Sequence, residues 1–412
     1  MLKRFTNFSL KMFTVLFPSE KPLLFNSVNS TIQLASFAQV SGSKRPLLVT
    51  EKFLLNLGLL DALLEHFKHE GCEVTIFDGI IPNPTYEVIE AGIRACQEND
   101  CDSVFAVGGG STLDAAKVIA ACYSNDVGVE EVVGLLKVKR PTLPFYVVPT
   151  TAGTGSEVTN AAVISETKTH QKKFVVDPKL IPSAAALDAN MMKSLPPHIT
   201  AATGMDALTH AIESYSSLNR FRDAERDAKL AIKLLLEYLP IVYEDGNNLD
   251  ARQWVALASF LAAYSFNKSG LGYVHAISHQ LSAHYNTPHG LTNAVILPRI
   301  LRFNKTACSH RFANLERMLS GVSTGTDEQL ADKFIARVDD LSRKLNIPSG
   351  FKELEAKDYD AITKNALKEA RSLYAVPRRM SSAQCKEILA SITAGATTER
   401  QVAETNQLIH AV

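Results

Sequence analysis

The chain has 412 residues, of which 46% are apolar, and it carries 43 basic and 43 acidic side chains. This length predicts more than one domain, and the balanced charge gives no electrostatic reason to expect a nucleic-acid or membrane partner. No apolar run is long enough to span a bilayer. The six cysteines are scattered, and the nearest pair, Cys96 and Cys101, lacks the spacing of a zinc ribbon or redox motif. We therefore expect free thiols in a reducing, cytoplasmic compartment.

Residues 1–40 are predicted to form a cytoplasmic N-terminal extension. Residues 1–17 loosely resemble a signal peptide, which leaves a targeting role as the alternative. Lys11 interrupts their apolar stretch, and no small-residue cleavage site follows, so the extension is the preferred interpretation.

The first half of the chain alternates strand-like and helix-like patterns. Amphipathic stretches at residues 57–68 and 87–97 have helical spacing. Strands alternating with helices predict βαβ units and a parallel sheet. The short apolar or β-branched runs that read as buried strands are 46–50, 73–77, 103–107, 145–149 and 184–187.

Beyond about residue 197 the pattern becomes helical. Two prolines interrupt it at residues 195–197, where the domain boundary is expected. The sequence thus predicts a Rossmann-like α/β dinucleotide-binding domain over residues 1–196 and an all-α metal and substrate domain over 197–412. The predicted helices of the second half are 201–216, 222–238, 251–266, 327–345 and 383–393.

A glycine cluster follows the third predicted strand directly and leads into a helix over residues 115–122. The segment consists of Gly108, Gly109, Gly110, Ser111, Thr112, Leu113 and Asp114. Glycines let the backbone approach a ligand closely, and the free N–H groups of the helix start favour a pyrophosphate. We expect the helix to begin at Ser111 or Thr112, with Asp114 in a capping-box role. The alternative is a tight turn without a ligand, since the motif is neither G-x-G-x-x-G nor a Walker loop.

Two further features suit a dinucleotide. Thr150, Thr151 and Thr154 lie in a loop of small and hydroxyl residues after the next strand, and this loop could also be a plain connection. Glu51 ends the first predicted strand, where its carboxylate could accept hydrogen bonds from a ribose diol or stabilise a helix N-terminus. Two loops after successive strands favour a dinucleotide site more than either loop alone.

A histidine cluster predicts a metal site. Asp206 and His210 are four residues apart, on one face of a predicted helix. A carboxylate and an imidazole in this arrangement can share one divalent ion. The candidates for further ligands are His275, His279, His284 and His289. Spacing alone selects His275 and His279, which repeat the four-residue spacing on another predicted helix. Pro288 marks a chain break that could aim His289 toward the others.

At these motifs the chain resembles the iron-containing (group III) alcohol dehydrogenase family, from about residue 45 to 320 and more weakly to the end. The matching elements are Asp78-Gly79 with Pro82-Asn83-Pro84, GGGSTLDAAK from Gly108, VPTTAGTGSE from Val148, TAATGMDALTHAIE from Thr200 and GYVHAISHQLSAHYNTPHG from Gly272. Several long motifs in the same order make this resemblance specific.

The resemblance implies a Rossmann-like NAD domain, a helical metal domain and a site residue set. It gives His279 a proton-relay role in place of a ligand role. It leaves Lys172 or Lys173 as the cofactor lysine, with Lys173 preferred, and it has aspartate where Glu51 stands. The implied metal ligands are Asp206, His210, His275 and His289, and the implied cofactor residues include Glu51, Asn83, Gly108, Gly109, Gly110, Ser111, Asp114, Thr150, Thr151, Thr154 and Leu187.

The activity implied by the resemblance is hydride transfer between NAD(H) and a small alcohol or aldehyde. The implied metal is Fe(II), with Zn(II) as an alternative in the isolated protein, and the implied assembly is a homodimer or larger homo-oligomer. The alternatives are a hydroxyacid–oxoacid transhydrogenase, a dehydroquinate-synthase-like lyase and a non-enzymatic metal-binding protein. The intact ligand set beside an intact glycine loop favours the dehydrogenase.

Overall fold

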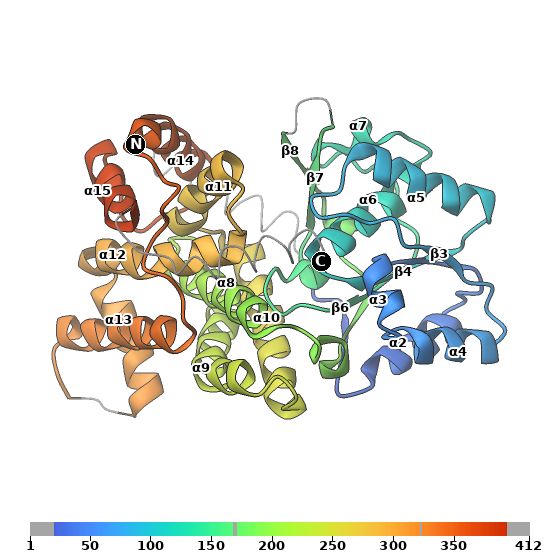
Figure 1. Cartoon of the computed structure of the whole chain (residues 1–412), viewed down its shortest axis with the longest axis horizontal. Helices are drawn as coiled ribbons and strands as arrows, with labels where there is room; N and C mark the ends of the chain where they lie inside the picture. Colours follow the sequence, from blue (N-terminus) through green and yellow to red (C-terminus); the bar gives the residue numbers. More distant parts are fainter. Residues whose placement is uncertain (1–19, 168–170, 322–323, 394–412) are drawn as a thin grey trace. The chain divides into compact units, whose positions relative to one another are not determined.

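The chain forms two compact units that divide between Leu195 and Pro196. The computed structural model describes residues 20–167, 171–321 and 324–393. The N-terminal unit is an α/β unit and the C-terminal unit is helical (Figure 1). The predicted fold class is confirmed.

A parallel sheet forms the centre of the N-terminal unit, with strand order β1-β9-β6-β4-β2-β3. Every neighbouring pair in it is parallel, and β2, β4, β6 and β9 are buried along their whole length. Burial on both faces explains why these strands are apolar throughout instead of alternating. The strands are β1 (Leu23–Asn26), β2 (Pro46–Val49), β3 (Thr75–Phe77), β4 (Ser103–Gly108), β6 (Phe145–Pro149) and β9 (Ala184–Leu187).

Helices cover both faces of this sheet (Figure 1). Leu47 and Val49 of β2 pack into a core with residues of α5 and α6, whereas Leu48 between them packs with residues of α2 and α4. This alternation is the two-residue period of a strand. The covering helices are α2 (Ser30–Val40), α4 (Asp61–His69), α5 (Tyr86–Glu98) and α6 (Gly110–Asn125).

One expectation for the start of the chain is wrong, and another needs a shifted boundary. Residues 23–40, assigned to an extension, form β1 and α2, because β1 pairs with β9 and completes the sheet edge. The helix expected over 57–68 is present as α4, which begins later, at Asp61, since Gly58 has a φ of +66°. A short separate helix, α3 (Lys52–Asn56), precedes it. The proposed targeting segment, residues 1–17, lies outside the described residues.

A second, three-stranded sheet was not predicted. It has the order β5-β8-β7, and its strands are β5 (Gly134–Leu135), β7 (Ala161–Ser165) and β8 (Lys172–Val176). Ala162 and Ile164 point from β7 into the core shared with α6, while the residues between them are partly exposed. Very short strands with one buried face give a weak sequence signal.

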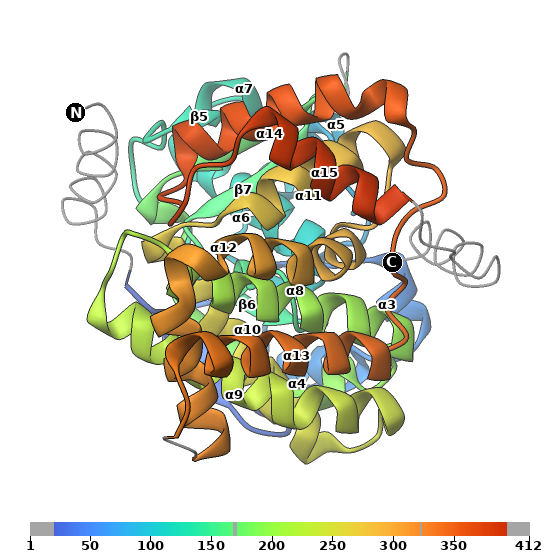
Figure 2. The same ribbon diagram turned by 90° about the vertical axis from the view of Figure 1, so that its left-hand side faces the viewer.

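The C-terminal unit is helical, and its helix α8 packs against α9, α10 and α12. In Figure 2, α11, α14 and α15 lie on one side of α12, and α9, α10 and α13 lie on the other. Gly204 lets α9 approach α8, since a Cβ there would lie 2.3 Å from the Leu239 side chain. The helices are α8 (Pro197–Ser216), α9 (Arg222–Glu244), α10 (Leu249–Ser269), α11 (Tyr273–Tyr285), α12 (His289–Ser320), α13 (Asp327–Lys344), α14 (Tyr359–Leu373) and α15 (Ser382–Thr393).

Two of these helices, α12 and α14, were not predicted. α12 continues through Pro298. Because proline usually ends or kinks a helix, the sequence of α12 does not predict one long helix. In the part of the chain that the structure describes, no helix combines the length and apolar character needed to cross a membrane.

Candidate metal and cofactor sites

Helix α8 provides the first two side chains of a buried cluster. Asp206 and His210 lie one turn apart, and both are less than 5% exposed. Asp206 Oδ1 is 3.8 Å from His210 Nε2. The His210 ring stacks on His275 with a centroid distance of 4.7 Å and contacts the tilted Phe266 ring at 4.4 Å. These two contacts restrict the ring orientation of His210.

The third side chain comes from the first turn of α11. His275 is buried, and its Nε2 is 3.7 Å from Asp206 Oδ1. Its other ring nitrogen, Nδ1, is 2.7 Å from Glu213 Oε2. Burial opposes protonation of His275, but the adjacent carboxylates of Asp206 and Glu213 outweigh it and raise the pKa of the imidazole to about 9.

The first residue of α12 completes the cluster. His289 Nε2 is 3.7 Å from Asp206 Oδ1, and the His289 side chain is 35% exposed. Gly290 permits the approach of α12 to α8, because a Cβ there would lie 2.5 Å from the backbone oxygen of Ala202. Pro288 is the N-cap of this helix, so the expected break before His289 is present.

A buried amide lies among these side chains. Asn293 Nδ2 donates to Asp206 Oδ1 at 2.6 Å and is 3.1 Å from Nε2 of both His275 and His289. An amide NH₂ can only donate, so the three surrounding atoms face it as acceptors. Acceptor atoms from three helices therefore converge on one position.

The residues present fit a divalent metal ion. One carboxylate oxygen and three imidazole nitrogens are suitable ligands for Fe(II) or Zn(II). The separations of 3.7–3.8 Å between Asp206 Oδ1 and the three Nε2 atoms are close to the roughly 3.4 Å expected for ligands about 2.1 Å from a tetrahedral ion. Asp206, His210 and His275 form the tightest group, with ligand atoms within 4.8 Å of one another.

Electrostatics favours an ionised Asp206. Burial alone would raise the pKa of its carboxyl group, but the nearby imidazoles of His210 and His289 lower it far below the usual value. A buried carboxylate that stays charged needs a positive charge nearby. A bound metal ion would provide this charge while the imidazoles that bind it stay neutral.

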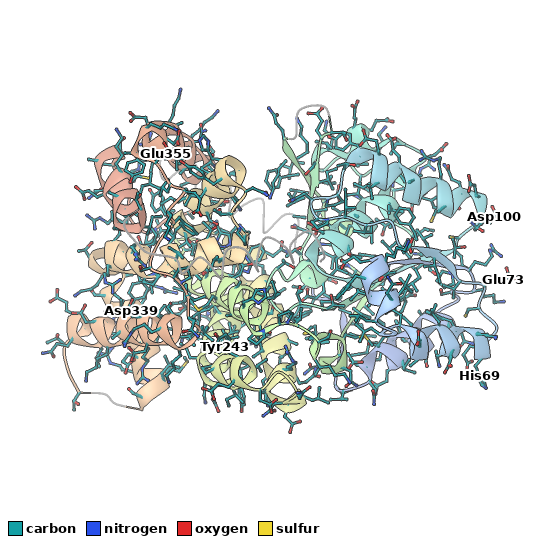
Figure 3. All side chains as sticks on the ribbon, in the orientation of Figure 1. His69, Glu73, Asp100, Tyr243, Asp339 and Glu355 are labelled. Carbon is teal, nitrogen blue, oxygen red and sulfur yellow. The ribbon has the colours of Figure 1, made fainter. Side chains whose placement is uncertain are left out.

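The other histidines of the stretch lie differently. His279 stacks on His289 with a centroid distance of 5.2 Å, and its Nδ1 is 2.7 Å from Glu369 Oε1. His284 Nε2 is 3.3 Å from Asp358 Oδ1. By contrast, His69 projects into solvent from the end of α4 (Figure 3), with a side chain that is 85% exposed.

The two predicted cofactor loops are in contact. The Thr150 backbone N–H donates to the Gly108 carbonyl at 2.9 Å. A Cβ on Gly110 would lie 2.8 Å from the Thr154 side chain, and one on Gly108 would lie 2.5 Å from the Thr112 side chain. Gly110 is therefore needed for the close packing of the two loops, and Gly108 for the close approach of the end of β4 to Thr112. α6 begins at Gly110 and not at Ser111 or Thr112, with Gly109 as its N-cap.

Glu51 lies at the point where the strand order reverses. From β2 the chain runs to β3 on one side and then to β4 on the other, so the residues following β2 and β4 flank the position where open sheets bind ligands. Glu51 Oε1 accepts hydrogen bonds from the Thr112 hydroxyl and, at 3.4 Å, from the Gly109 N–H. Burial raises the pKa of the Glu51 carboxyl despite these hydrogen bonds.

The expected capping role of Asp114 is wrong. Its carboxylate accepts hydrogen bonds from the Ser156 hydroxyl at 2.6 Å and from the Val163 N–H at 2.8 Å. Asp114 lies on the fifth residue of α6, past the first turn, and points toward the loop after β6 and toward β7. It therefore connects α6 to the second cofactor loop instead of capping its own helix.

The remaining cofactor candidates lie in the same unit. Asn83 adopts a φ of +54° in the connection between β3 and α5. Lys172 and Lys173 lie on β8, and Lys173 Nζ is 3.3 Å from Glu166. Leu187 ends β9, and its carbonyl accepts a hydrogen bond from the Ser30 hydroxyl.

Comparison with known proteins identifies the family. Residues 24–189 match the family model described as iron-containing alcohol dehydrogenase. Residues 200–393 match the model described as the C-terminal part of the Fe-containing alcohol dehydrogenase family. The chain belongs to the iron-containing alcohol dehydrogenase family. The family predicted from the motifs is therefore confirmed, and the match begins about twenty residues earlier than expected, at β1.

Individual members of this family resemble the chain over most of its length. It is 36% identical to a 1,3-propanediol dehydrogenase of Klebsiella pneumoniae, covering 90% of this chain and 96% of that protein. It is also 36% identical to an NAD-dependent methanol dehydrogenase of Bacillus methanolicus, covering 80% and 87%. A solved 1,3-propanediol oxidoreductase superimposes with a TM-score of 0.87 at 35% identity, covering 91% of this chain and 99% of that chain.

Sequence reasoning missed three polar residues at the metal cluster, namely Glu213, Asn293 and Glu369. Two of them had a usable signal. Glu213 follows Asp206 by seven residues and Asn293 follows His289 by four, so each shares a helix face with a candidate ligand. Glu369 has no such signal, because it comes from a distant helix.

Proposed function

We propose that this protein is an NAD(H)- and metal-dependent oxidoreductase of small alcohols and aldehydes. The observation that carries the proposal is the convergence of the Asp206 carboxylate and the Nε2 atoms of His210, His275 and His289. The relatives named as NAD-dependent methanol dehydrogenase and 1,3-propanediol dehydrogenase support this reaction class.

Each part of the chain has a separate task. Asp206 and the three imidazoles would hold an iron(II) ion, with zinc as the alternative. Gly108–Gly110, Ser111 and the threonines after β6 would bind NAD through backbone N–H groups and hydroxyls. When bound, the ion would supply Lewis acidity toward the alcohol oxygen, and NAD would serve as the hydride acceptor.

His279 is the proposed proton carrier. Its ring stacks on that of His289. Its Nδ1 is 2.7 Å from Glu369 Oε1, which can accept a hydrogen bond from Nδ1–H. In this tautomer Nε2 carries the lone pair, and it would accept the proton released by the alcohol. Glu369 is itself held by the Tyr374 hydroxyl at 2.7 Å and by the Gln280 amide at 3.0 Å. A fixed carboxylate keeps the His279 ring in one orientation.

Two properties of the whole protein are also proposed. Six free cysteines support a reducing, cytoplasmic compartment. The family resemblance supports a homodimer or a larger homo-oligomer.

Removal and return of the metal test the proposed function. The chelated protein should lose at least ~10²-fold of its NADH-dependent aldehyde reduction and regain it with Fe(II). Zinc binds such ligands more tightly than Fe(II), so aerobically purified protein should contain zinc. The variant Asp206→Ala should retain neither metal nor activity. Full activity in protein that elemental analysis finds metal-free would contradict the proposal.

A further inference from the structure

The Glu213 side chain connects the metal cluster to the start of α11. Glu213 lies on α8, three residues after His210, and is 6% exposed. Its Oε1 accepts the Val274 N–H at 2.7 Å, and its Oε2 accepts the Gly272 N–H at 2.8 Å. The same Oε2 is 2.7 Å from His275 Nδ1. One buried carboxylate is therefore shared by three donors from a single turn.

This contact determines which nitrogen of His275 faces the cluster. An imidazole that binds a metal ion has lost the proton on the ligating nitrogen and keeps one on the other, and Glu213 offers an acceptor to Nδ1–H. Nε2 is then left with its lone pair directed toward Asp206, 3.7 Å away, and toward the Asn293 NH₂ at 3.1 Å. The other tautomer would place an N–H among the ligand atoms and would leave two acceptors opposed at Glu213.

The backbone around Gly272 is shaped for the same contact. A Cβ at Gly272 would lie 2.7 Å from Glu213 Oε1, so a larger residue would push the start of α11 away from α8. α8 thus contributes Asp206 and His210 directly and contacts the His275 imidazole through Glu213.

We propose that Glu213 is a positioning residue of the metal site, which fixes the tautomer and ring orientation of His275 for metal binding. The proposal rests on the proposed metal-binding function. The competing interpretation is that Glu213 only caps the N-terminus of α11 and stabilises the fold. The two interpretations differ in their effect on metal affinity, because a cap alone would change stability without changing the ligand geometry.

The variant Glu213→Gln separates them. Its amide is the same size but places an NH₂ group against at least one of the N–H groups that Glu213 accepts. Carboxylates that orient a metal-binding histidine contribute about 10- to 100-fold to metal affinity, and we expect a loss of this size. Affinity is measured on the full-length, metal-free protein by competition between the protein and a chelator for Zn(II). The absorption bands of the Co(II)-loaded protein should also shift, since they report ligand geometry.

Glu316→Gln is the matched control. Glu316 is a buried carboxylate of the same helical unit, and it is paired with Arg337 instead of with a metal-site residue. Both variants should unfold at a lower denaturant concentration in the metal-free state. Only Glu213→Gln should weaken Zn(II) binding and shift the Co(II) bands.

The outcomes are distinguishable. Zn(II) affinity within about threefold of wild type, with unchanged Co(II) bands, would overturn the positioning role and leave a cap. If Glu213→Gln does not fold, the same criterion applies to Glu213→Asp, which keeps the charge but withdraws it by one methylene from His275. A wild-type protein without saturable Zn(II) or Co(II) binding would overturn the metal site itself, and the role of Glu213 with it.

Discussion

His279 and His289 show, at the scale of single residues, how small the difference is between a proposed metal ligand and its neighbour. Both rings lie beside the cluster and stack on each other, yet only His289 has a nitrogen within 3.7 Å of the Asp206 carboxylate. His279 turns its Nδ1 to Glu369 instead. The spacing of His275 and His279 on one helix therefore does not determine the ligand set.

Substitution of these two histidines should have different results. His279→Ala should retain the metal but lower turnover by about 10²-fold, because it removes the proposed proton carrier. His289→Ala should lose metal and activity together. Metal analysis of both purified variants beside turnover measurements decides the roles. Loss of metal from His279→Ala with retention in His289→Ala would show that the two assignments must be exchanged.

Glu51 should control the choice between NAD and NADP. A 2′-phosphate near its carboxylate would be repelled by on the order of 4 kcal/mol per charge pair at ~4 Å and an effective dielectric of about 20, before screening. After screening and side-chain rotation, we expect NAD to be preferred by about 10- to 100-fold in kcat/KM. Glu51→Gly should admit NADP and weaken NAD binding modestly.

Glu51→Gln is the control for the structural contacts that Glu51 makes with the glycine loop. It keeps the size of the side chain that contacts Gly109 and Thr112 but removes the charge. It should therefore lower the NAD/NADP ratio with less damage to NAD binding than Glu51→Gly. An unchanged ratio in both variants, or equal efficiency of the wild-type protein with the two cofactors, would rule out this role.

At the scale of elements, the metal cluster depends on how closely α8, α11 and α12 approach one another. Each helix contributes at least one side chain to the cluster, and a glycine lies at two of the contacts between these helices. Gly272 contacts the Glu213 carboxylate, and Gly290 contacts the Ala202 carbonyl. A helix displaced by less than an ångström would therefore change the separation of the ligand atoms.

Gly290→Ala tests this dependence. Its methyl group would lie 2.5 Å from the Ala202 carbonyl and 3.4 Å from the Asp206 Cβ, so α12 must move away from α8. We expect a stability loss of about 1–3 kcal/mol and weaker Zn(II) binding. Gly128→Ala is the control, since its nearest neighbour would be 4.0 Å away and it should leave metal affinity unchanged. Wild-type Zn(II) affinity in Gly290→Ala would show that the approach of these helices does not limit the site.

For the whole molecule, a buried charged group near the cofactor loops should make stability depend on pH. Glu157 is 2% exposed, and burial raises the pKa of its carboxyl group to about 7. Burial also lowers the pKa of Lys117, on the same core, to about 8. Lys117 Nζ donates to the Thr159 carbonyl and hydroxyl and to the Ala161 carbonyl, which holds the second cofactor loop against α6.

The sign of the Glu157 effect follows from its raised pKa. Between pH 4.5 and 7 the folded state binds more protons at Glu157 than the unfolded state, so its contribution to stability is present below pH 4.5 and is lost as the pH rises through 7. Glu157→Gln removes this dependence. The variant should gain on the order of 1–3 kcal/mol over wild type at pH 8 and very little at pH 5.

Denaturant unfolding of the full-length protein at both pH values measures this difference. A gap between Glu157→Gln and wild type that is equal at pH 5 and pH 8, or larger at pH 5, would contradict the expected protonation.

The sequence alone determined the fold class and the family. Short apolar runs such as 103–107 and 145–149 favour buried strands, and glycines directly after a strand permit close backbone contacts. It did not reveal β7, β8 or α12, because short strands with one exposed face and a helix containing Pro298 have patterns that other structures share.

Only the tertiary structure decided the neighbours of each candidate side chain. It placed Asp114 against Ser156 and Val163, and it placed His289, Glu213 and Asn293 around Asp206 and His275. Spacing along a helix specifies which residues share a face, but the packing of α8, α11 and α12 specifies what that face meets. The ligand atoms therefore converge through contacts between residues about 70 to 90 positions apart, such as Asp206 with His275 and Asn293, which no local pattern records.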